Sequence, residues 1–322
     1  MRVAVYLPLL LPLLAALLAP RAGDRLPPRA ATWLLTTGAL VLAAASTAAL
    51  GMLAVTGLIR IPLLARLAHH HWSATAAQHH DPAALSVAAL AALALAVLTA
   101  MAATMLQRRI RTLAATAREA ACLPGRDQLV VVDDPAAEAY AMPGRPGRIV
   151  VSTGMLGALD GAEHQVLLAH ERAHLTHRHH LFVALAQLAA TANPLLRPLA
   201  AAVGYTVERW ADESAATVTG DRARVARTIG KAALAARRTS ARTRVPATAL
   251  ALLGRLRPGP RPALGPVPRR VTALLAPAPG GRTWTATALG GLAALTVLCA
   301  AEAAHDLEAL LELVKHAAAR GR

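Results

Sequence analysis

One stretch of the sequence has residue types and spacing that could bind a metal ion and activate water: H-E-x-x-H at residues 170–174. The residues around it are rich in Ala and Leu and lack Gly and Pro, which predicts a helix. Residues four apart on a helix differ by about 40° around the axis and about 6 Å along it, so His170 and His174 point the same way. Their imidazoles can reach one zinc ion at about 2.0–2.1 Å, and Glu171 can take a proton from water beside it. The alternative is a pair of solvated histidines on a polar helix face.

A hydrolytic zinc site needs a third protein ligand, and the sequence offers three candidates. His180 has the metzincin spacing, but that pattern needs Gly where this chain has His177, and without the turn His180 would lie about 9 Å further along the helix. Glu208 is the better candidate. It lies on a second predicted helix, where Asp212 is four residues on and can hold a ligand histidine by its outer N–H. Glu213 is the fallback, although it lies off that face.

The elements that must position these residues include membrane spans. The chain has 322 residues, of which 55% are hydrophobic and 2% aromatic. Segments of about 20 apolar residues span a bilayer, which predicts helices at residues 3–19, 32–59, 83–106 and 284–301. Pro8 and Pro12 interrupt the first segment. It could be a signal peptide, but it has no clear cleavage site, so we interpret it as a kinked first span.

Positive charges next to the spans predict their orientation. Arginines crowd the exit of the third span, at positions 108, 109, 111 and 118, and such residues mark the cytoplasmic side. The predicted topology therefore has both termini outside. Residues 1–106 form three spans, 107–283 a cytoplasmic domain with a basic Pro/Arg-rich linker at 255–270, 284–301 the fourth span and 302–322 a short extracytoplasmic tail. The two cysteines imply no disulfide framework, which suits a reducing compartment for the soluble part.

Within the cytoplasmic segment the pattern predicts a small α+β domain. A polar helix at 107–121 continues out of the membrane, and strands are expected at 128–132 and 148–152. An acidic start at 160–163 favours the beginning of the motif helix. The apolar run 181–203 is long enough for a fifth span, but Asn193-Pro194 breaks it. A fifth span would also put Glu208 and His170 on opposite sides, so we predict two short helices packed on the site or entering the bilayer surface.

The combination H-E-R-A-H, Asn193-Pro194-Leu195 and Glu208-x-x-x-Asp212 resembles the BlaR/MecR-type membrane metallopeptidases. It is also similar to the related prenyl-protease and heat-shock membrane peptidases, all gluzincins. The resemblance implies a mainly α, multi-pass fold: four transmembrane helices and a cytoplasmic zincin-like domain with a small sheet. It also implies a substrate-binding edge strand at Ala139, Tyr140 and Ala141, with Glu138 where relatives usually carry Asn. The antibiotic sensors continue into a penicillin-binding domain, which this sequence does not contain, so β-lactam sensing is not expected.

The resemblance implies a role for each site residue. His170, His174 and Glu208 would bind one zinc per chain, Glu171 would act as general base and acid, and Asp212 would support a ligand histidine. The expected activity is hydrolysis of peptide bonds in cytoplasmic or membrane-associated proteins, including cleavage of a repressor in signalling. A His from 177–180 is a candidate for the second oxyanion donor. The alternative is a catalytically silent zinc-binding membrane scaffold or regulator.

Charge also bears on the partners. The formal net charge is +16, and eight basic residues lie between Arg222 and Arg244. Attraction to the anionic inner leaflet of the bilayer explains this excess. Nucleic acid is a disfavoured partner because no aromatic stacking platform accompanies the arginines. Histidines at 69–71 and 79–80 could bind a metal, but we interpret them as an ordinary polar loop.

Overall fold

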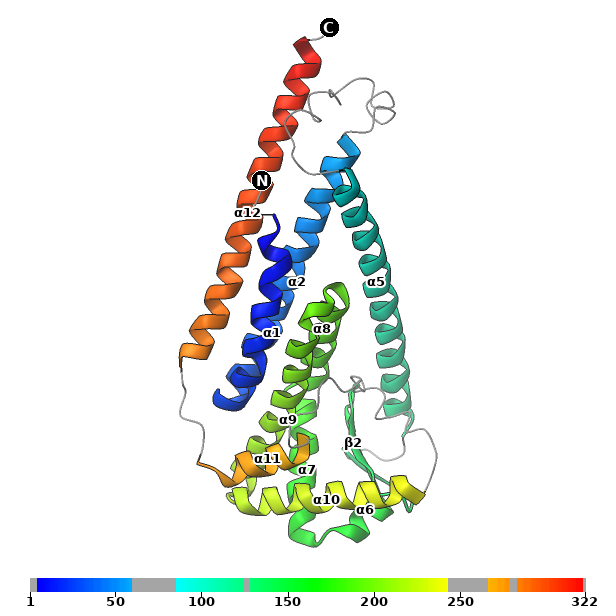
Figure 1. The fold of residues 1–322 in the computed structure, drawn as a ribbon. Coiled ribbons are helices and arrows are strands. Elements are labelled where there is room, and N and C mark those ends of the chain that lie inside the picture. Colours follow the sequence, from blue (N-terminus) through cyan, green and yellow to red (C-terminus); the bar gives the residue numbers. More distant parts are fainter. Residues whose placement is uncertain (1–4, 60–84, 124–127, 243–265, 278–282, 321–322) are drawn as a thin grey trace.

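The structure is a computed structural model and describes residues 5–59, 85–123, 128–242, 266–277 and 283–320. It is mainly helical with one small three-stranded sheet. Four long helices lie side by side in Figure 1, and the sheet gathers with the shorter helices at one end of them. The ends of α1 and α12 nearest the two chain termini point away from the sheet.

The four long helices are α1 (Leu7–Arg25), α2 (Pro28–Ile59), α5 (Leu85–Cys122) and α12 (Thr283–Arg320). Within the described residues, these are the helices long and apolar enough to cross a membrane, by length and composition. Large apolar side chains remain exposed on their outer faces, including Leu10, Leu13, Leu14, Leu17, Leu90, Leu93 and Val97. Such faces suit lipid rather than water. The apolar segments predicted from the sequence are thus helical. Pro8 lies in the first turn of α1 and Pro12 lies inside the helix, so the interrupting prolines do not end it.

The apolar run 181–203 lies in two helices, as predicted, and these form a hairpin. Helix α8 (His179–Ala192) ends at Asn193, the short 3₁₀ helix η1 (Pro194–Leu196) turns the chain, and α9 (Arg197–Thr219) returns. Asn193 donates from Nδ2 to Ser46 Oγ on α2 at 2.9 Å, which fixes the turn among the long helices. The predicted break at Asn193-Pro194 is correct. The second half is not short, because Pro198 lies in the first turn of α9, where proline is tolerated.

The two strands predicted from the pattern are present, and so is the strand at 139–141 that the resemblance implies. Strands β1 (Leu129–Val132), β2 (Ala139–Met142) and β3 (Arg148–Ser152) pair in the order β1-β3-β2. β1 is parallel to β3, and β2 is antiparallel to it, with Tyr140 opposite Val150. β2 is therefore an edge strand. Its position next to the motif helix makes it the part of the sheet that faces the site.

The motif helix α7 (Gly161–Thr176) follows the short helix α6 (Thr153–Ala158). Its start is fixed by a capping box, in which the Asp160 carboxylate accepts from the Glu163 N–H and Glu163 accepts from the Asp160 N–H. The predicted acidic helix start thus acts as a cap. Arg178, in the left-handed conformation, separates α7 from α8 and reverses the chain.

Two further helices complete the domain, and one corrects the sequence prediction. Helix α10 (Arg222–Arg242) is basic, and α11 (Pro266–Leu275) packs against α9 and α10. The interpretation of 255–270 as a linker is wrong for its last residues, because 266–270 begin α11. Val271 and Leu274 of α11 pack in a hydrophobic cluster with residues of α7 and α9. Residues 255–265 and the histidines at 69–71 and 79–80 lie outside the described residues.

Candidate metal centre

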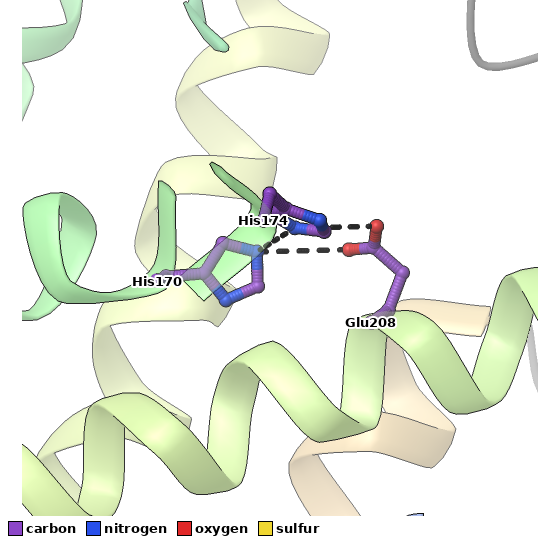
Figure 2. A group of neighbouring side chains, drawn as sticks. All are labelled: His170, His174 and Glu208. Atoms are coloured by element: carbon purple, nitrogen blue, oxygen red, sulfur yellow. Dashed lines mark hydrogen bonds and ion pairs between the residues drawn. The ribbon is translucent and has the colours of Figure 1, made fainter. Parts of the chain in front are cut away.

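Helix α7 presents His170 and His174 on one face, as the i, i+4 spacing predicts. Both imidazoles are largely buried, with side-chain exposures of 12% and 13%. Their Nε2 atoms lie 3.2 Å apart (Figure 2). Two nitrogens converging in this way through a shared helix face can ligate the same cation.

Glu208 completes the group from α9, which crosses beside α7. Its Oε2 lies 3.7 Å from His170 Nε2 and its Oε1 lies 3.7 Å from His174 Nε2 (Figure 2). A tetrahedral zinc with bonds of about 2.0–2.2 Å requires ligand atoms roughly 3.3–3.6 Å apart. The separation of the two nitrogens and the shortest distance from each nitrogen to Glu208 are within about 0.1 Å of that range, although the two imidazoles approach different carboxylate oxygens. One donor atom from each residue can be chosen so that all three lie within 4.8 Å of one another. Two imidazoles and one carboxylate are also the donor set of hydrolytic zinc sites, so these residues fit a zinc ion.

Glu171 lies beside the triad but points a different way around α7. It is buried, with an exposure of 9%. Burial raises the pKa of its carboxyl to about 6, while the neighbouring His170 lowers it and Glu208 raises it. The backbone N–H of Ala141 on the edge strand offsets part of this rise, which places Glu171 next to β2. A carboxyl with a pKa near neutrality is suited to accept and return a proton.

Asp212 lies one turn beyond Glu208 on α9, behind the ligand pair. It is 1% exposed, and its Oδ1 is 3.0 Å from Nδ1 of His170. This contact can hold the ring and direct its Nε2 at the metal position. Although burial opposes it, interaction with Asp212 and Glu208 raises the pKa of His170 to about 10. Metal binding there therefore has to displace a proton.

Arg270 was not predicted from the sequence. From α11, its Nε donates to Asp212 Oδ2 at 2.7 Å, its Nη2 donates to Oδ1, and its Nη1 lies 2.8 Å from Glu208 Oε2. One guanidinium thus bridges the proposed ligand and the residue that orients His170. Burial acts against ionisation of both carboxyls, but Arg270 and the histidines hold the pKa of Glu208 and Asp212 below their ordinary values. The paired carboxylates keep the pKa of Arg270 above its usual value despite burial.

His179 contacts the other ligand histidine. Its Nδ1 lies 3.1 Å from Nδ1 of His174, and the side chain is 1% exposed. The ring packs on Trp210 with centroids 4.8 Å apart, and His177 stacks on the same indole at 4.6 Å. Burial lowers the pKa of His179 to about 3 and that of His174 to about 4, so both rings are neutral at pH 7. His179 is thus a residue from the 177–180 cluster that reaches the site from behind.

The remaining candidates lie elsewhere. His180 lines a groove on the far side of the α7–α8 turn and does not join the metal-ligating group. Glu213 forms a fork with Arg222, at 2.6 Å from Nη2, so it is committed to another partner. The structure therefore groups His170, His174 and Glu208, with Glu171 and Asp212 around them. Ala139, Tyr140 and Ala141 form the edge strand next to Glu171.

The chain was compared with models of protein families. Residues 100–244 match Peptidase family M48. This match supports the M48 metallopeptidase family. M48 metallopeptidases are normally zinc-dependent, and the His-His-Glu group described above could bind that metal. The matched residues include α7, α9 and the whole of α10 but end before Arg270. Comparison with curated proteins and with solved structures finds no match.

Proposed function

We propose that this protein is an integral-membrane zinc metalloendopeptidase whose active site faces the cytoplasm. The observation that carries this proposal is the convergence of His170, His174 and Glu208, whose donor atoms lie within 4.8 Å of one another, with the buried carboxyl of Glu171 beside them. The match to Peptidase family M48 supports the same chemistry.

In this proposal the chain's own residues divide the work. His170, His174 and Glu208 would hold the zinc, which when bound lowers the pKa of a coordinated water toward about 7 and polarises a carbonyl. Glu171 accepts the proton of the attacking water and donates it to the amine leaving group. Asp212 and His179 orient the two imidazoles, while Arg270 balances the charge of the Asp212 and Glu208 carboxylates.

The substrate would be an extended peptide segment added to the free edge of β2. β3 occupies one side of β2, and no described strand pairs with the other. Backbone hydrogen bonds along such an edge hold a peptide regardless of its sequence, and side-chain pockets then add specificity. Ala141 lies beside Glu171, so a segment bound there would pass the catalytic carboxyl. A cytoplasmic repressor is a candidate substrate, in line with the resemblance to the BlaR/MecR-type sensors.

Positive charge at the end of the apolar part of α5 supports the cytoplasmic side for the peptidase domain. Arg108, Arg109 and Arg111 follow the apolar part of α5, next to the peptidase domain. Reporter fusions after residues 120 and 240 should therefore both report cytoplasm, and fusions near residue 75 and at the C-terminus should report the outside. Opposite reports from the 120 and 240 fusions would mean that the α8–α9 hairpin crosses the bilayer, and the proposed topology would fail.

The peptidase activity is tested with Glu171→Gln, which keeps size and hydrogen bonding but removes basicity. The variant should fold and bind zinc as the parent does. Its cleavage of unfolded casein in detergent with added zinc should fall by at least the roughly 10²–10⁴-fold typical of acid–base catalysis. Zinc content and thermal unfolding of both proteins serve as controls. If parent and variant cleave casein equally and a chelator affects neither, the peptidase proposal is wrong and the protein is a zinc-binding scaffold.

A further inference from the structure

A groove of about 780 Å³ lies next to the candidate site, at the end of the edge strand. Its walls come from four separate parts of the chain: the end of α5, Gln128 just before β1, the loop between β2 and β3, and the turn from α7 into α8. Two of these walls continue directly from the site. Leu175 follows His174 on α7, and Pro143 follows the last residue of β2. A peptide extended along β2 past the site would therefore enter the groove.

The floor of the groove is the β2–β3 loop, which lies close to both neighbouring helices. A Cβ at Gly144 would lie 3.3 Å from Ala120 Cβ of α5, and one at Gly147 would lie 3.4 Å from both Cδ atoms of Leu175 on α7. The glycines thus let the loop backbone approach α5 and α7 together. Arg148, at the start of β3, is buried and donates to the Ala120 carbonyl, which ties the loop to α5. The groove is a formed surface, because the β2–β3 loop packs on both α5 and α7.

The charge of the groove has one sign. Arg118, Arg145 and Arg178 line it together with His180, and none of the described lining residues is acidic. Within the described part of the chain, these three guanidiniums form no side-chain hydrogen bond or ion pair, in contrast to Arg222, Arg269 and Arg270. Burial lowers the pKa of His180, and Arg109 and Arg178 lower it further, so this ring is a neutral hydrogen-bonding group. Positive charge therefore comes from the arginines alone.

We propose that this groove, lined by Arg118, Arg145 and Arg178, is a specificity subsite that selects acidic residues of the peptide substrate near the cleaved bond. The inference deepens the proposed peptidase function and rests on it. Guanidinium groups recognise carboxylates through charge and a planar fork of donors, whereas an uncharged or basic segment gains nothing there. The groove lies beyond the site along β2, so it distinguishes substrates without contacting the reacting atoms.

Binding of peptides to Glu171→Gln tests the subsite without requiring turnover. The probes are fluorescein-labelled extended peptides with an Asp, Asn or Lys pair near one end, made in both orientations because the direction along β2 decides which end meets the groove. With the full chain in nanodiscs of zwitterionic lipid, the Asp peptide of one orientation should bind at least about fivefold more tightly than its Asn counterpart, about 1 kcal/mol. Arg145→Glu and Arg178→Glu should abolish or invert that preference. Arg145 lies in the exposed loop, so its variant leaves α7 and α8 unchanged.

The matched control is Arg237→Glu, an equal change of net charge on the exposed face of α10 outside the groove. If this control reduces the preference as much as Arg145→Glu does, the effect is non-specific and the proposal fails. Equal binding of Asp and Asn peptides also overturns it, as does a preference lost only in anionic nanodiscs, which would make lipid headgroups the occupant. If the parent cleaves peptides without preferring acidic ones, the subsite proposal is wrong and the peptidase proposal stands. If the parent prefers to bind acidic peptides but cleaves none, the peptidase proposal is wrong and the binding site stands.

Discussion

The histidine pair on α7 and the Asp212–Arg270 pair behind it are brought to the same site in different ways. His170 and His174 are four residues apart on one helix, so their convergence follows from helix geometry alone. Asp212 and Arg270 are 58 residues apart and come from α9 and α11. Their contact depends on how these helices pack, with the undescribed residues 243–265 between them.

This difference separates the residues that would bind the metal from those that would adjust its affinity. The donors of the α7 pair and of Glu208 decide whether a cation is bound at all. The outer groups contact the donors from behind: Asp212 and Arg270 on the side of His170 and Glu208, and His179 on the side of His174. Loss of a ligand should therefore abolish binding, whereas loss of an outer group should weaken it by a limited factor.

The largest expected effect is on zinc content. Purified parent should carry about one zinc per chain. His170→Ala, His174→Ala or Glu208→Ala should release it, because two remaining donors fall short of the three protein ligands that a hydrolytic zinc site uses. Plasma mass spectrometry of dialysed protein measures the content. His180→Ala is the matched control, since His180 is a nearby histidine at the start of α8 that lines the groove and is not one of the proposed ligands. Full zinc in Glu208→Ala together with loss in His180→Ala would show that the ligand assignment is wrong.

The two routes also explain how much could be predicted from the sequence. Periodicity is sufficient for the grouping of His170 with His174 and of Glu208 with Asp212, because each pair lies on one helix. The break at Asn193 follows from Pro194, because a proline disfavours helical backbone at the residue before it. The resemblance indicated the edge strand, and pairing with β3 places it next to α7.

Arg270 could not be predicted in the same way. Its neighbours Pro266, Pro268 and Arg269 give the segment the composition of a linker, and no local pattern shows which carboxylate an arginine will meet. The available signal was the apolar spacing of Val271, Leu274 and Leu275, which favours a short amphipathic helix. Glu213 was a candidate ligand for a similar reason: its partner, Arg222, lies beyond the end of α9 and becomes adjacent only after Gly220 turns the chain.

The next effect concerns Arg270. Arg270→Gln leaves the buried Asp212 and the half-buried Glu208 without their guanidinium partner. It should weaken zinc affinity and kcat/KM by about 10–100-fold, the range for groups that orient metal ligands. Arg270→Lys should give a smaller loss, because Lys keeps the charge but not the fork of donors. Zinc affinity is measured by competition with a fluorescent chelator.

Arg269→Gln is the control for this change. Arg269 is the adjacent residue on α11, but it pairs with Asp24 and lies over the Tyr205 ring at 4.2 Å, away from the metal ligands. Its replacement should leave zinc affinity unchanged. If the two variants lose affinity equally, α11 stabilises the domain as a whole and the specific role of Arg270 is wrong.

The smallest expected effect concerns His179, on the other side of the pair. If His174 ligates through Nε2, its proton is on Nδ1 and is donated to Nδ1 of His179. The proton of His179 is then on Nε2, a buried atom for which the described residues provide no hydrogen-bond partner. An unsatisfied buried N–H costs roughly 1–3 kcal/mol, so part of the benefit of orienting His174 is offset. Zinc affinity should therefore fall only about tenfold in His179→Phe, at the low end for such groups.

His177→Phe separates this hydrogen bond from packing. Both histidines lie against Trp210, with ring centroids at 4.6 Å and 4.8 Å, but only His179 is in contact with Nδ1 of His174. Phenylalanine preserves the ring in each case, so thermal unfolding of the two variants should change by similar small amounts. Zinc affinity should fall in His179→Phe and stay within about threefold of the parent in His177→Phe, since the second change removes no contact to a ligand. Equal affinity in all three proteins would mean that Asp212 and Arg270 orient the site without help from the His174 side.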